Sequence, residues 1–92
     1  MAEENKAEVP DELTIELRKP VELAGETTYV LELREPTVDE LDRFMKALDK
    51  HGPIEATKLL ISAVSGVSVA VLGKVGARDF KTAESYLSNF FG

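Results

Sequence analysis

The sequence contains no cysteine and no tryptophan, and it has a single histidine, His51. Without cysteine, neither a disulfide framework nor a thiolate metal site can hold the fold. One histidine also gives no spacing of the kind that zinc sites use. His51 stands beside Gly52, where the last turn of a predicted helix leaves carbonyl groups free to meet an imidazole. We therefore expect no bound metal and no cofactor.

Long apolar runs and clusters of positive charge are also missing. The run "VSVAVL" is far shorter than the roughly 20 apolar residues that cross a bilayer, and the N-terminus is acidic where a signal peptide would be basic. The formal net charge is −6, so a nucleic-acid partner would meet no basic stripe. We expect a soluble intracellular protein that binds neither membranes nor nucleic acid.

Catalytic motifs are absent as well. None of the serines stands in a G-x-S-x-G turn, and the segment "LGKVG" lacks the Lys-Ser or Lys-Thr pair of a phosphate-binding loop. The acidic pair Asp39-Glu40 lies at the start of a predicted helix, where carboxylates act as caps. The sequence predicts that the protein is not an enzyme.

What the chain does contain is enough apolar residues for one core. At 92 residues and 43% hydrophobic content, a single domain is expected. Residues 1–12, "MAEENKAEVPDE", carry five acidic residues and one lysine. Such a polar segment buries too little surface to offset the entropy lost on ordering. We expect a disordered acidic tail over residues 1–12 and a single domain over residues 13–92.

The domain begins with a predicted β-hairpin. Leu13, Ile15 and Leu17 alternate with polar residues, which is the period of a half-buried strand. Pro20 interrupts this pattern at an edge or a bulge, and "AGET" supplies a turn around Gly25. A second alternating strand follows over residues 29–34. Because a lone hairpin is marginal in water, helices must cover it.

Helices are predicted for the rest of the chain. Thr37 and Glu40 fit a capping box, and apolar residues recur with helical spacing up to "HGP" at residues 51–53. A second helix is predicted over residues 53–65. Residues 67–76 fit either a strand or a short helix capped by Ser68, and the helix is favoured. A last helix starts near Ala77. We expect an α+β fold in which three or four helices pack on an N-terminal antiparallel β-hairpin.

The C-terminal third holds more large apolar side chains than so short a segment needs. Most of the apolar helical positions should form the core, namely Leu41, Phe44, Leu48, Leu60, Ile61, Val64, Phe80 and Leu87. A surplus remains beyond them, and part of it can form an exposed patch for another protein. We predict that the residues of this partner-binding patch are Val69, Val71, Leu72, Tyr86, Phe90 and Phe91.

Three ordered segments, "LRKPVELAGETTY", "LELREPTVDEL" and "ARDFKTAESYLSNFF", resemble the tail assembly chaperone family of tailed bacteriophages and prophages, the small type found in Mu-like phages. The resemblance runs from about residue 13 to residue 91. Its most specific pieces are Arg18 to Pro20, Gly25 to Tyr29, Leu33 to Thr37, Asp79-Phe80 and Phe90-Phe91.

The resemblance implies an assembly role in the cytoplasm of the bacterial host. Such proteins bind the tape measure protein, keep it soluble while tail tube subunits polymerise around it, and are absent from the finished virion. The tail tube protein is a further partner that the family implies. The residues by themselves leave an alternative, which is a structural virion subunit or a small adaptor whose apolar surplus serves self-association. The oligomeric state stays open.

Overall fold

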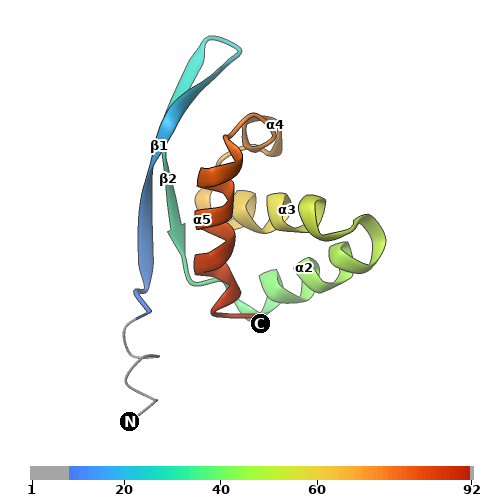
Figure 1. Ribbon diagram of the computed structural model, residues 1–92. Coiled ribbons are helices and arrows are strands. Elements are labelled where there is room, and N and C mark those ends of the chain that lie inside the picture. Colours follow the sequence, from blue (N-terminus) through green and yellow to red (C-terminus); the bar gives the residue numbers. More distant parts are fainter. Residues whose placement is uncertain (1–8, 92) are drawn as a thin grey trace.

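The computed structural model describes residues 9–91 and places every helix on one face of a β-hairpin (Figure 1). The predicted α+β fold, a hairpin followed by helices, is confirmed. Most of the predicted acidic tail lies outside the described residues. Its last part is in contact with the domain, because Val9 packs against the core and the first strand begins at Glu12.

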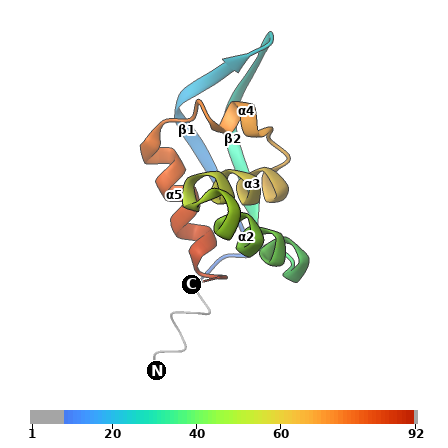
Figure 2. The same cartoon turned by 90° about the vertical axis from the view of Figure 1, so that its right-hand side faces the viewer.

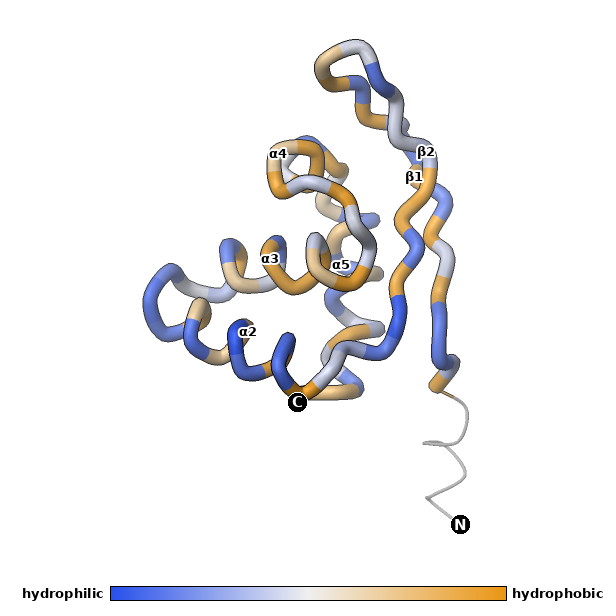
Figure 3. The backbone as a smooth tube through the Cα atoms, turned by 180° about the vertical axis from the view of Figure 1, so that it is seen from behind, coloured by the Kyte–Doolittle hydropathy of each residue, from blue (hydrophilic) through white to orange (hydrophobic). Residues whose placement is uncertain are grey.

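The hairpin consists of β1 (Glu12–Leu23) and β2 (Glu26–Arg34), which pair in antiparallel register. Ala24 and Gly25 form the two-residue turn, and both have positive φ angles, 54° and 82°. Turns of this kind match the right-handed twist of the strands. Hydrophobic and hydrophilic residues alternate along both strands (Figure 3), so one face of the hairpin is available for the helices.

The two strands lose their regular register in the middle of the hairpin. Glu16 pairs with Val30, and pairing resumes only at Val21 with Thr28. Residues 17–20 of β1 therefore lie opposite a single residue of β2, Tyr29. The bulge contains Pro20, which has no N–H group to donate, so the sequence prediction of an interruption there is confirmed.

Helix α2 (Val38–His51) starts with the capping box that the sequence predicts. The backbone N–H of Glu40 donates to the Thr37 side chain at 3.2 Å, and the Thr37 N–H donates to the Glu40 carboxylate at 2.9 Å. These bonds satisfy two N–H groups that the first turn of a helix leaves free. The helix ends at Gly52, whose positive φ of 88° suits a residue without Cβ.

We expect Thr37→Ala to lower the free energy of unfolding by about 1 kcal/mol, because one of the two cap bonds disappears. Urea denaturation followed by circular dichroism measures the change. Thr37→Ser is the matched control, since serine keeps the accepting hydroxyl. An alanine variant as stable as the parent would show that the capping box does not hold the start of α2.

The remaining helices are α3 (Pro53–Ser65), α4 (Val69–Leu72) and α5 (Ala77–Ser88). Helix α3 has the predicted bounds. The ambiguous segment contains a short helix, and the Ser68 side chain accepts from the N–H of Val71, as predicted for its cap. Helix α5 ends earlier than the apolar spacing suggested, so Phe90 and Phe91 belong to a turn beyond it rather than to its apolar stripe.

The core lies between the inner face of the hairpin and the helices. Its largest fully buried side chains come from β2, α3, α4 and α5, and they are Leu31, Leu33, Ile61, Leu72 and Leu87. Phe44, Leu60 and Val64 are also buried, as predicted. The other residues of the predicted set, Leu41, Leu48 and Phe80, are half-buried, and Leu48 and Phe80 pack against the core. Helix α2 is thus covered less completely than its apolar residues suggest.

Helices α3 and α5 form the layer next to the strands, where α3 packs mainly on β2 and α5 on β1. Helix α2 packs against α3 and lies outside this layer. The turn between α2 and α3 points away from the hairpin in Figure 1, and both helices lie in front of the strands in Figure 2. This arrangement leaves much of α2 in contact with solvent.

Candidate partner-binding surface

Two of the six predicted patch residues lie in the core. Leu72 is 2% exposed and Tyr86 is 6% exposed. The Tyr86 hydroxyl donates to the backbone carbonyl of Pro10 at 2.8 Å, which ties the start of the chain to α5. Burial raises the pKa of Tyr86, so this phenol remains a neutral donor. In this structure both side chains have a packing role.

The other four predicted residues are half-buried and lie in two places. Val69 and Val71 belong to α4, whereas Phe90 and Phe91 follow α5. Phe90 packs edge-on against Tyr86 with ring centroids 5.4 Å apart. Phe91 packs against the ring of Phe44 in α2 at 4.5 Å. The structure therefore brings Phe91 beside α2, and it does not join all six residues into one patch.

The most exposed large apolar side chains are ones that the sequence interpretation did not select. They lie on the hairpin, on α2 and on α3, and they are Tyr29, Val30, Val38, Met45, Ile54 and Leu59. Val38 is 81% exposed and Met45 is 53% exposed, although both stand in the apolar pattern of an amphipathic helix. Their exposure shows that α2 has an apolar face that is not fully covered.

Val38, Leu41, Met45 and Leu48 form what we call the α2 stripe. They stand three, four and three residues apart, so they lie along one side of the helix. Phe44, the only buried residue of α2, lies on the neighbouring side that packs inward. Because Phe91 packs against Phe44, the predicted patch and the α2 stripe are adjacent. In the sequence, this surface is indicated by apolar residues that recur every three or four positions in addition to the residue that faces the core.

The first turn of α2 is fixed by an ion pair with the end of β2. The Arg34 guanidinium donates to both oxygens of the Glu40 carboxylate, at 2.9 Å and 2.7 Å. Arg34 also donates to the backbone carbonyl of Ala63 in α3. The hydrogen bonds from Arg34, assisted by the backbone N–H of Thr37, lower the pKa of Glu40 to about 2. One arginine thus joins β2, α2 and α3.

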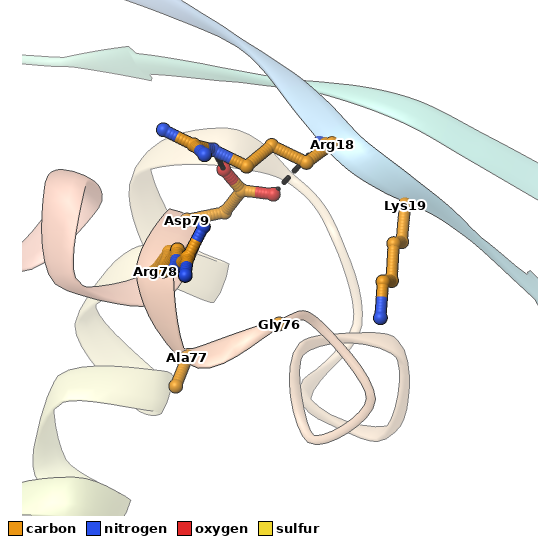
Figure 4. A pocket seen from close by; sticks show the side chains of 6 residues that line it. All are labelled: Arg18, Lys19, Gly76, Ala77, Arg78 and Asp79. Carbon is orange, nitrogen blue, oxygen red and sulfur yellow. Dashed lines mark hydrogen bonds and ion pairs between the residues drawn. The ribbon is translucent and has the colours of Figure 1, made fainter.

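A second junction connects the β1 bulge to the start of α5 (Figure 4). The Asp79 carboxylate is buried and accepts the backbone N–H of Arg18 at 2.8 Å. The Arg18 side chain lies 3.7 Å from the same carboxylate. A hollow of about 430 Å³ lies beside this junction, and Lys19, Gly76, Ala77 and Arg78 complete its lining. The contact brings together the segments "RKP" and "ARDF", which are far apart in the sequence.

Two features of the described residues bear on other functions. Within residues 9–91 there is no group of three or more His, Cys, Asp or Glu side chains that could hold a metal ion. None of the helices in this range is long and apolar enough to cross a membrane.

An open apolar stripe next to a pair of packed aromatic rings is typical of proteins that bind other proteins. A family model described as phage tail assembly chaperone proteins, E, or 41 or 14, matches residues 14–92. The chain therefore belongs to the phage tail assembly chaperone family, and the resemblance seen in its sequence is confirmed. Membership implies that the protein interacts with tail proteins as an assembly factor. No curated protein and no solved structure matches the chain.

Proposed function

We propose that the protein binds the tape measure protein in the cytoplasm of the bacterial host and keeps it soluble during assembly of the tail tube. The family supports an assembly role, and the open α2 stripe is the observation that carries the proposal to a client protein. A chaperone for a long helical client needs an apolar surface on a soluble body, and this chain carries a net charge of −6.

The binding surface that we propose combines the predicted and the observed apolar residues. Phe91 and the α2 stripe form its centre, because the Phe44 ring connects them. Phe90, Val69 and Val71 remain proposed contacts as half-buried side chains. The core residues Leu72 and Tyr86 support α4 and α5 from inside rather than facing the client.

The test is to express the chain together with the tape measure protein of the same phage or prophage. We expect the tape measure protein to be soluble and to co-purify with the chain, and to aggregate without it. The double variant Phe90→Asp with Phe91→Asp should abolish co-purification. Tyr29→Asp is the matched control, because it changes an exposed apolar residue on β2 rather than on α2.

Failure of the two proteins to associate would overturn the proposal. A stable large ring or filament of the chain alone, detected by light scattering, would then favour the alternative of a self-associating structural subunit. A thermal melt of the double variant shows whether it is folded, since both phenylalanines are half-buried.

A further inference from the structure

The α2 stripe has the spacing of a coiled-coil seam. Intervals of three, four and three residues are the a and d positions of a heptad, at which side chains insert between those of a second helix. An amphipathic helix of a globular protein needs one apolar face toward its own core. Helix α2 already has that face at Phe44. The α2 stripe extends this face toward solvent: Leu41 and Leu48 are half-buried and Leu48 packs against the core, whereas Val38 and Met45 are exposed. Its spacing fits a helix better than an extended chain.

Acidic side chains border the α2 stripe on the side away from Phe44. Asp42 and Asp49 are exposed and stand four residues after Val38 and Met45, respectively. Lys46 lies 3.0 Å from Asp42, whereas Asp49 forms no ion pair within residues 9–91. These positions flank the seam of a coiled coil, where charges determine which partner is accepted. The border therefore favours a partner with lysine or arginine next to its apolar residues.

A second copy of the chain fits this surface poorly. In an antiparallel pair of α2 helices, the borders with Asp42 and Asp49 would face each other, and like charges would repel. In a parallel pair, each acidic border would meet the side of α2 that carries Phe44, which Phe91 already covers. The charge pattern thus distinguishes a foreign helix from self-association.

We propose that the α2 stripe binds one amphipathic helix of the tape measure protein, whose apolar residues follow the three-and-four spacing and whose flanking positions are basic. This inference rests on the proposed function and specifies the segment of the client that the protein selects. Phe91, which packs against Phe44, belongs to the same proposed surface. Basic flanks on the client would pair with Asp49 first, since Asp42 already has Lys46 as a neighbour.

The apolar part of the proposal is tested with Val38→Asp and Met45→Asp in the full chain. Both side chains are mostly exposed, so the fold should persist, which a thermal melt checks. Overlapping fragments that together span the tape measure protein are titrated with each variant, and calorimetry measures their affinity. We expect Met45→Asp to weaken binding of the recognised fragment by about tenfold or more, because an apolar contact becomes a buried charge. Tyr29→Asp is expected to leave the affinity unchanged.

The charge part is tested with two synthetic helices of about four heptads, identical in their apolar residues but flanked by lysine in one and by glutamate in the other. We expect the chain to bind the lysine peptide more tightly, with an affinity that falls as salt is added. Asp49→Lys should reverse or remove this preference. Glu26→Lys, which changes the net charge equally at the hairpin turn, should preserve it.

The outcomes separate this inference from the function on which it rests. If the tape measure protein co-purifies with the parent chain and binds Met45→Asp equally well, the function stands and the α2 stripe is overturned as its site. If the glutamate peptide binds as tightly as the lysine peptide, the charge selection is overturned. If the lysine peptide binds but the tape measure protein never does, the stripe is a helix site and the proposed client is wrong. If the stripe variants alter only self-association, the foreign-helix inference is overturned.

Discussion

Replacing Glu40 by glutamine is expected to lower the free energy of unfolding by about 2 kcal/mol. Glutamine cannot accept two charge-assisted bonds, so the bidentate contact with Arg34 at 2.9 Å and 2.7 Å is lost. The Glu40 side chain is 13% exposed and that of Arg34 is 42% exposed, so solvent screens the arginine and keeps the loss moderate. Urea denaturation at neutral pH measures the difference. Glu32→Gln is the control, because it removes an equal charge from an exposed position in β2.

The same pair makes the stability depend on pH. The pKa of Glu40 is lowered to about 2 in the folded protein and is about 4.5 when the chain is unfolded. Its contribution is therefore complete above about pH 4.5 and is lost as the pH falls through about 2. We expect the stability of the parent to fall more steeply in this window than that of Glu40→Gln. Parallel pH curves for the two proteins would show that Arg34 does not stabilise the carboxylate in solution.

Asp79→Ala is the second substitution with a large expected effect, about 2 to 3 kcal/mol of stability. The bulge in β1 leaves the backbone N–H of Arg18 outside the strand ladder, and the buried Asp79 carboxylate is its acceptor. Alanine leaves this N–H without a partner next to the core. For a chain of this size, the loss corresponds to a fall in Tm of roughly 10 to 20 °C, which calorimetry measures.

Two variants show which part of this contact matters. Arg18→Ala removes only the exposed side chain, 3.7 Å from Asp79, and should cost little because the backbone N–H remains. Asp79→Asn keeps an accepting oxygen and should lie between the alanine variant and the parent. If Arg18→Ala were as harmful as Asp79→Ala, the ion pair rather than the backbone bond would be the stabilising contact.

The elements of the fold could be predicted where local chemistry decides them. The capping box at Thr37 and Glu40, the turn at Gly25 and the cap at Ser68 each depend on residues within a few positions of one another. The Asp79 contact with Arg18 spans 61 positions along the chain, and no local pattern indicates it. The sequence placed a break at Pro20 but could not identify the group that holds the bulge.

The candidate site was harder to predict because burial depends on tertiary packing. Leu72 and Tyr86 look like surplus apolar residues in the sequence, but the hairpin and α3 provide room for them in the core. Met45 recurs with helical spacing together with Leu41 and Leu48, yet it is 53% exposed. Which of two adjacent apolar sides of α2 faces inward is decided by its contact with α3, which helical periodicity cannot show.

Helix α2 lies outside the layer next to the strands, and this placement affects which substitutions the protein can tolerate. The exposed residues of its α2 stripe, Val38 and Met45, contribute little to the core, so substitutions there should leave folding nearly untouched while they alter binding of the proposed client. Recognition and stability are then encoded by separate residues. A descendant of this chain could acquire a different client by exchanging a few side chains on one helix, and a designer could use the hairpin with α3 and α5 as a fixed scaffold for the same purpose.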